Sequence, residues 1–177
     1  MKPILVLGIG NILLADEGVG VHVFHEMAAR ADAARLALPD GVELFDGGTF
    51  GIDLLDTLAN RRKVIVIDAV RADAAPGTVL RFTAADLVRR EATDLSLHQV
   101  GLLETLTMAG HLGCAPDEVV IFGIVPRTLD PGLELSPEVA AVVPRVVDLV
   151  VDELRKGAKA NRHARPPAVG QEGEKAP

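Results

Sequence analysis

The sequence predicts a single α/β domain built on a doubly wound, mostly parallel twisted sheet of about five strands, with helices on both faces. Three observations support this prediction. Short, wholly apolar runs, such as residues 4–7 and 64–67, are typical of strands that are buried on both faces. Glycine-rich loops follow the runs that end at residues 7 and 45. Segments with helical apolar spacing separate the runs, which favours right-handed parallel crossovers.

The first half of the chain alternates strand and helix patterns. Val19, Val23 and Met27 repeat at helical spacing after the first glycine-rich loop, so they predict an amphipathic helix. In order, we expect strands at residues 4–7, 42–45 and 64–67, with helices from residue 19 into the Ala/Arg-rich stretch at 29–37 and across residues 52–58.

The second half predicts an edge strand, a last buried strand and three helices. The edge strand at residues 78–82 has mixed polarity and is expected to be antiparallel. A proline follows Ser136, which is typical of a helix start with a capping hydroxyl, and Pro144 is expected to kink or break that helix. The remaining elements are helices at residues 84–90 and 100–112 and a strand at 119–122, with Ser96 and His98 in the loop before residue 100.

Composition limits the class of protein. The 177 residues fit one domain, which we place at residues 1–156, followed by a disordered polar tail at residues 157–177. The single cysteine, Cys114, excludes an internal disulfide and indicates a cytoplasmic protein. A net charge of −7 argues against nucleic acid as a partner, and no apolar run reaches the ~18 residues that a membrane span needs.

Acidic residues follow several predicted strands. Glu17 lies in the first glycine-rich loop, Asp46 follows the second strand and Asp68 follows the third. Because the carboxyl ends of parallel strands share one edge, these acids are expected to meet there, within reach of the loop that carries His98. Carboxylates and an imidazole suit a divalent metal such as nickel, zinc or manganese, with positions left open for a partner's ligand.

Each candidate also has a purely structural interpretation. Asp16 is better explained as the N-cap of the first helix than as a ligand, and Asp46 can equally initiate a turn at the glycine pair that follows it. Asp68 is harder to explain in this way, because an acid inside a buried strand is costly unless it is paired or coordinated. His22, His25 and His111 are expected to be surface or fully hydrogen-bonded histidines rather than ligands, and Cys114 is expected to be a packing residue rather than a nucleophile.

Three familiar chemistries receive little support. The Gly8-Ile9-Gly10 turn imitates a dinucleotide-binding fingerprint, but Leu13 stands where the third glycine belongs and acids flank the site for the pyrophosphate. The chain has no Walker-type lysine loop, no G-x-S-x-G elbow and no H-E-x-x-H helix.

Six segments in register resemble the nickel-iron hydrogenase maturation endopeptidases. The resemblance runs from the N-terminus to the final helix and leaves the tail after Gly157 unaccounted for. The segments are Gly8-Ile9-Gly10-Asn11, Asp16-Glu17-Gly18-Val19-Gly20, Asp46-Gly47-Gly48-Thr49, Ile67-Asp68-Ala69, His98-Gln99-Val100-Gly101-Leu102 and Gly123-Ile124-Val125-Pro126.

The resemblance implies a cytoplasmic endopeptidase that removes a C-terminal extension from the hydrogenase large-subunit precursor after nickel insertion. The family's metal ligands map onto Glu17, Asp68 and His98, and an aspartate needed for processing maps onto Asp46. We expect the nickel to be carried by the precursor, with other divalent metals as substitutes, and the protease to be a monomer. Activation of the attacking water by the metal or by Asp46 stays open. The alternatives are a non-catalytic metal-binding chaperone for the precursor and, with less support, a nucleotide-binding oxidoreductase.

Overall fold

One five-stranded sheet forms the centre of the computed structural model, which describes residues 2–49, 54–88 and 97–162. The strand order is β2-β1-β3-β5-β4, and only β4 runs antiparallel to its neighbour. The strands are β1 (Ile4–Ile9), β2 (Val42–Gly48), β3 (Lys63–Ala69), β4 (Val79–Thr83) and β5 (Glu118–Ile124). The predicted α/β fold and its antiparallel edge strand are confirmed.

The two central strands continue beyond their apolar runs. Every residue of β1 and β3 is buried, as expected for strands covered on both faces. β1 continues through Gly8 to Ile9, and β3 continues through Asp68 to Ala69. Asp68 is therefore part of the strand, and its side chain is fixed by the pleat.

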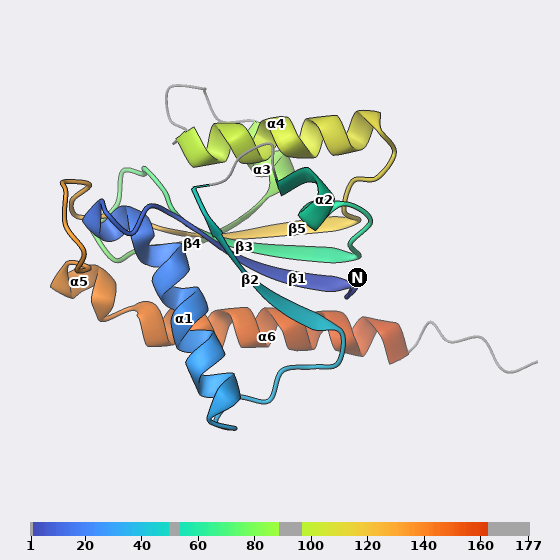
Figure 1. The fold of residues 1–177 in the computed structure, drawn as a ribbon, viewed down its shortest axis with the longest axis horizontal. Helices are drawn as coiled ribbons and strands as arrows, with labels where there is room; N and C mark the ends of the chain where they lie inside the picture. The colour runs from blue at the N-terminus through green and yellow to red at the C-terminus, as the bar shows by residue number, and fades with distance from the viewer. Residues whose placement is uncertain (1, 50–53, 89–96, 163–177) are drawn as a thin grey trace, which may run out of the picture.

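Helices cover both faces of the sheet, α1 and α6 on one side and α2, α3 and α4 on the other (Figure 1). The helices of the described residues are η1 (Ala15–Gly18, a 3₁₀ turn), α1 (Val19–Asp32), α2 (Leu55–Leu58), α3 (Ala84–Val88), α4 (Leu97–His111), α5 (Pro137–Ala140) and α6 (Val143–Arg162). Helix α4 begins earlier than expected, so His98 lies in its first turn rather than in a loop. Ile52, Ser96 and residues 89–90, which carried other sequence predictions, lie outside the described residues. None of the helices in the described parts of the chain is long and apolar enough to span a membrane.

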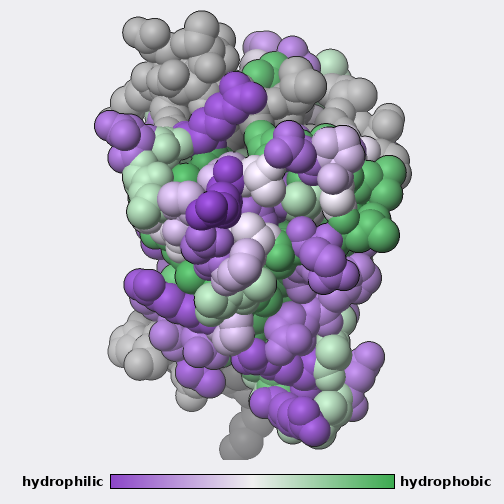
Figure 2. Space-filling view, turned by 90° about the vertical axis from the view of Figure 1, so that its left-hand side faces the viewer, coloured by the Kyte–Doolittle hydropathy of each residue, from purple (hydrophilic) through white to green (hydrophobic). Residues whose placement is uncertain are grey.

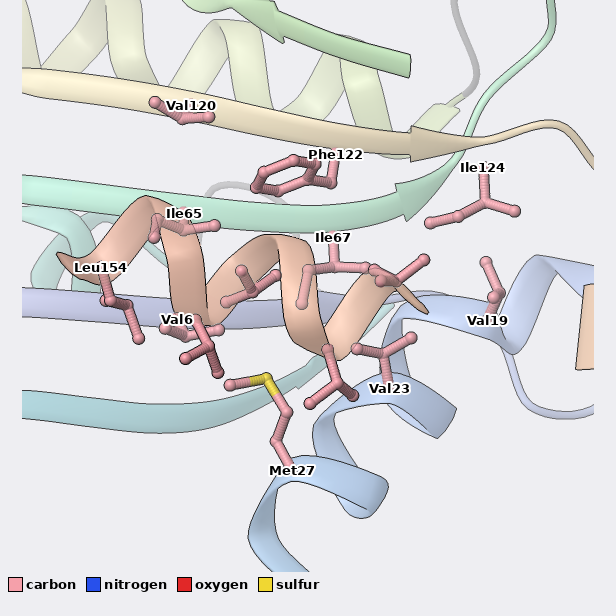
Figure 3. Close-up of a cluster of buried hydrophobic side chains, with 14 of the residues drawn as sticks. Val6, Val19, Val23, Met27, Ile65, Ile67, Val120, Phe122, Ile124 and Leu154 are labelled. Carbon is pink, nitrogen blue, oxygen red and sulfur yellow. The ribbon is translucent and has the colours of Figure 1, made fainter. Parts of the chain in front are cut away.

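Successive side chains of each strand point to opposite faces of the sheet, so the strands contribute to two separate hydrophobic cores. On one face, strand residues meet α1 and α6, as Figure 3 shows for Val6, Ile65, Ile67, Val120 and Phe122 on the sheet, Val19, Val23 and Met27 on α1, and Leu154 on α6. The intervening residues Val64 and Val66 pack with Leu58 and Leu102 on the other face. Both faces are covered, and ligands of open α/β sheets generally bind beyond the carboxyl ends of the strands.

The C-terminal helices break before Pro144, as the sequence predicted. α5 ends at Ala140 and α6 begins at Val143, so Pro144 occupies the first turn of α6, where its missing N–H group has no partner to lose. The capping role expected for Ser136 is wrong, because its side chain makes no bond to the start of α5. Helix α6 also continues past the expected domain boundary at Lys156 to Arg162. The tail from residue 163 onward lies outside the described residues.

A buried ion cluster ties α6 to the sheet near the amino ends of the strands. Glu153, 2% exposed, accepts hydrogen bonds from Lys63 Nζ at 2.6 Å and from Arg81 Nε at 3.1 Å. Burial alone would raise the pKa of Glu153. The hydrogen bonds and charges of Arg81 and Lys63 outweigh that effect and lower the pKa from its ordinary value of 4.5 to about 2.

This cluster predicts a loss of stability in acid. Because the pKa of Glu153 is lower in the folded state, its contribution is present above about pH 4.5 and disappears as the pH falls towards about 2. The interval corresponds to about 3 kcal/mol of unfolding free energy. As the pH is lowered across this range, the unfolding free energy measured with urea is expected to fall more steeply for the wild type than for Glu153→Gln.

The matched control is Asp152→Asn, one residue away on the same helix with its side chain 64% exposed. It should keep the wild-type pH dependence. Equal acid sensitivity of the wild type and Glu153→Gln would contradict the assignment to Glu153.

Candidate active site

The loop between β1 and η1, residues 10–14, folds back tightly onto the turn that follows it. Gly10 adopts a φ of 148°, a conformation that favours glycine, and a Cβ atom at this position would overlap the Glu17 carbonyl. The Gly10 N–H also donates to the Gly48 carbonyl at 2.8 Å. The glycines of the two loops thus bring the ends of β1 and β2 together at one edge of the sheet.

Glu17 lies in η1 at this edge. Its side chain is half-buried, and η1 packs against β3 as well as α1. The first turn of α1 is packed equally close to β1 and β3, because a Cβ atom on Gly20 would collide with the carbonyls of Ile9 and Ile67. Close packing of η1 and α1 on the ends of β1 and β3 places Glu17 beside the strand that carries Asp68.

Asp68 is 2% exposed and lies one residue before the end of β3. Its Oδ1 atom accepts the Ala69 N–H at 2.9 Å. Strand alternation places Asp68 on the same face as Val64 and Val66, which is the face that α4 covers. The expectation of a buried acid in this strand is met, whereas its role as a metal ligand stays a prediction.

His98 is brought to the same edge by its backbone. It lies in the first turn of α4, and Figure 1 shows that α4 starts near the carboxyl ends of the strands. Its side chain lies outside what the structure describes. Within the described residues no group of three His, Cys, Asp or Glu side chains could hold a metal ion. The trio of Glu17, Asp68 and His98 therefore stays a prediction.

Asp46 lies near the end of β2 and is exposed. Its Oδ1 atom accepts the Gly48 N–H at 2.9 Å, which is the turn that the sequence offered as the structural interpretation. The Oδ2 atom lies 3.8 Å from Nε2 of His25, whose side chain is 65% exposed. The sequence predicted a surface histidine but gave no signal of this neighbour, because the two residues belong to different elements.

A shallow hollow of about 300 Å³ lies between the loops that follow β1 and β2. Asp46 forms part of its wall, together with Gly10 and Gly48. The other lining residues are Asn11, Ile12, Leu13, Val21 and Thr49. Its lining combines glycines, apolar side chains and one carboxylate, so it offers both apolar and polar contacts to a ligand.

Asp16 is not the N-cap that the sequence predicted. Its carboxylate is 0% exposed and caps neither η1 nor α1. Instead, Oδ2 accepts the N–H groups of Arg127 at 2.9 Å and Thr128 at 3.2 Å and the Ser136 hydroxyl at 2.8 Å. The Oδ1 atom accepts the Ser136 N–H at 2.7 Å. Burial would raise the pKa of Asp16, but these hydrogen bonds prevail and hold it below its usual range.

His22 also departs from its expected role as a surface or fully hydrogen-bonded histidine. Its Nε2 atom is buried, with no hydrogen-bond partner among the described residues. Burial and the neighbouring His25 lower the pKa of His22, against a smaller opposing effect of Glu134. Cys114 is half-buried and unpaired, in agreement with a packing role, and His111 is exposed.

The comparisons with known proteins all point to one family. The sequence profile of the hydrogenase maturation protease family matches residues 21–153, a range that includes Asp46, Asp68 and His98 but starts after Glu17. The hydrogenase 2 maturation protease of Escherichia coli K12 is 36% identical over 154 residues, covering 86% of this chain and 91% of that protein. The hydrogenase expression/formation protein HupD of Bradyrhizobium diazoefficiens is 39% identical over 172 residues, covering 95% of this chain and 86% of the relative.

Solved structures agree with these relatives. The hydrogenase maturating endopeptidase HybD from E. coli superposes with a TM-score of 0.77 at 36% identity, covering 89% of this chain and 94% of that one. A [NiFe] hydrogenase maturation protease HybD from Thermococcus kodakarensis gives a TM-score of 0.68 at 27% identity, covering 85% and 97%. These names support a hydrolytic endopeptidase over the non-catalytic chaperone and the oxidoreductase that the sequence left as alternatives.

Proposed function

The chain belongs to the hydrogenase maturation protease family, and from that premise we propose that it removes the C-terminal extension of a nickel-iron hydrogenase large-subunit precursor after nickel insertion. In this proposal the nickel arrives as part of the substrate. Glu17, Asp68 and His98 contact it, and the peptide bond to be cut lies near Asp46.

The observation that carries the proposal is the position of Asp68. It is a buried carboxylate near the carboxyl end of β3, a central strand that contacts the turn carrying Glu17, and strand alternation places it on the face covered by α4. Two carboxylates and an imidazole suit a borderline divalent cation such as nickel. Three ligands leave coordination positions for the precursor's own groups, so the set fits a metal shared between two proteins.

Among the described residues, the Asp46 carboxylate lies where it can accept a proton. One of its oxygens is held by the Gly48 N–H, while the carboxylate stays exposed at the wall of the hollow. In the proposed reaction, water attacks the scissile carbonyl carbon, its proton passes to Asp46, and Asp46 returns the proton to the leaving amine. Substantial cleavage by Asp46→Asn would instead indicate that the attacking water is activated by the precursor's metal.

Nickel recognition makes a direct prediction for precursor processing. The purified protein is expected to cleave nickel-loaded precursor at least about tenfold faster than nickel-free precursor. Only the loaded form presents a metal ion that Glu17, Asp68 and His98 can bind. Processing shortens the large subunit and is followed by gel shift and by the mass of the released peptide. Equal cleavage of both forms would overturn nickel recognition while leaving the endopeptidase activity in place.

A further inference from the structure

Four exposed apolar side chains gather on the two loops beside the candidate site. Among the described residues, the exposed large hydrophobics are Ile12, Leu13, Leu129 and Leu133 on these loops, Met108 in the last turn of α4 and Leu112 directly after it. We call the first four the loop patch. Leu13 is 61% exposed and Leu133 is 64% exposed, so most of each side chain faces solvent.

The two loops of the loop patch are joined through their backbones. Leu14 and Gly132 form a parallel bridge, in which the Ala15 N–H donates to the Gly132 carbonyl at 2.7 Å and the Gly132 N–H donates to the Leu13 carbonyl at 3.0 Å. The Asp16 carboxylate also holds the β5–α5 loop (residues 125–136) in place, because it accepts four hydrogen bonds from that loop. These bonds fix the backbone on both sides of the bridge, where the side chains of Leu13 and Leu133 are exposed.

The loop patch is continuous with the candidate site. Ile12 and Leu13 line the same hollow as Asp46. Figure 2 shows this side of the molecule, on which green apolar side chains lie between purple polar ones. Two acidic residues lie close by in the chain: Glu17 in η1, which follows the first loop, and Glu134 within the second loop. The surface therefore complements a partner that is apolar and that carries positive charge at the point facing the strand ends.

We propose that the loop patch docks the folded body of the large-subunit precursor around its metal-bearing end. The proposal rests on the proposed function, which supplies a partner with these properties: a protein surface that presents a divalent cation. A second copy of this chain on the loop patch would cover the hollow and Asp46, so self-association there would compete with processing.

The test compares two leucines of nearly equal exposure. Leu133→Asp is expected to weaken the binding of full-length precursor by at least about tenfold, because it places a charge within an apolar contact. Leu133→Met should bind almost as the wild type does. Leu112→Asp is the matched control, since Leu112 is 63% exposed but follows α4 near the amino ends of the strands. Binding is measured directly by calorimetry, cleavage by kcat/KM, and oligomeric state by gel filtration.

The outcomes separate this proposal from the proposed function. If the wild type bound precursor without cutting it and Leu133→Asp bound it more weakly, the docking surface would be supported and the proposed proteolysis would be overturned. Cleavage by the wild type with unchanged binding by Leu133→Asp would overturn the docking surface alone. A change in oligomeric state with unchanged precursor affinity would also overturn it, in favour of a second copy. Failure of the wild type to bind precursor would overturn both.

Discussion

Asp68→Asn is expected to lose precursor processing by about a thousandfold or more, because an amide cannot supply the charge that the proposed contact with nickel requires. The substitution preserves shape, and the amide oxygen can still accept the Ala69 N–H. The unfolding free energy should therefore fall by no more than about 2 kcal/mol. Glu17→Gln is expected to show the same loss of processing with a smaller effect on stability, since Glu17 is only half-buried.

The control for this pair is Asp56→Asn, which removes an exposed carboxylate from α2. It should process precursor at the wild-type rate. Gel-shift time courses on nickel-loaded precursor, together with urea unfolding of each variant, separate lost chemistry from lost fold. A folded Asp68→Asn or Glu17→Gln that processes at the full rate would remove that residue from the site.

Asp16→Ala is expected to reduce the unfolding free energy by about 3 kcal/mol or more, which makes it the largest stability change that we predict. The carboxylate is fully buried, and its removal leaves the N–H groups of Arg127, Thr128 and Ser136 without their acceptor. Asp16→Asn should be less severe, because one oxygen remains, although its amide group would face a donor at Ser136. Urea unfolding at neutral pH measures the difference.

A surface aspartate provides the comparison for Asp16. Asp148 has a side chain that is 78% exposed, with its nearest cation, Arg30, at 4.0 Å. Asp148→Ala should change the unfolding free energy by no more than about 0.5 kcal/mol. If Asp16→Ala were as mild as Asp148→Ala, the hydrogen bonds to the β5–α5 loop would not be what stabilises this edge of the sheet.

The sheet could be predicted because its signals are local. Apolar runs such as those of β1 and β3 are buried on both faces, and that pattern alone distinguishes parallel strands from surface ones. Asp68 could be predicted as special for the same reason, since an acid in such a run is costly without a partner. The exposed Asp46 and its turn were also within reach, because the turn depends only on the two glycines that follow it.

Asp16 was misassigned because its partners are remote in sequence. Local preference favours an aspartate as an N-cap at the start of a helix. Instead, the Asp16 carboxylate accepts N–H groups of residues that lie between 111 and 120 positions after it in the sequence. The early start of α4 and the exposure of Leu13 and Leu133 were equally hidden, since each depends on where other segments pack.

The bond between Asp16 and Ser136 also constrains the order in which the protein becomes competent during folding. It closes a loop of 120 residues, which makes it one of the longest-range contacts of the domain and an entropically costly one to form early. Strands β1 and β3 can pair before residue 136 has left the ribosome, but the turn that carries Glu17 is fastened only afterwards. We therefore expect a nascent chain to form its sheet first and to fix the turn that carries Glu17 last.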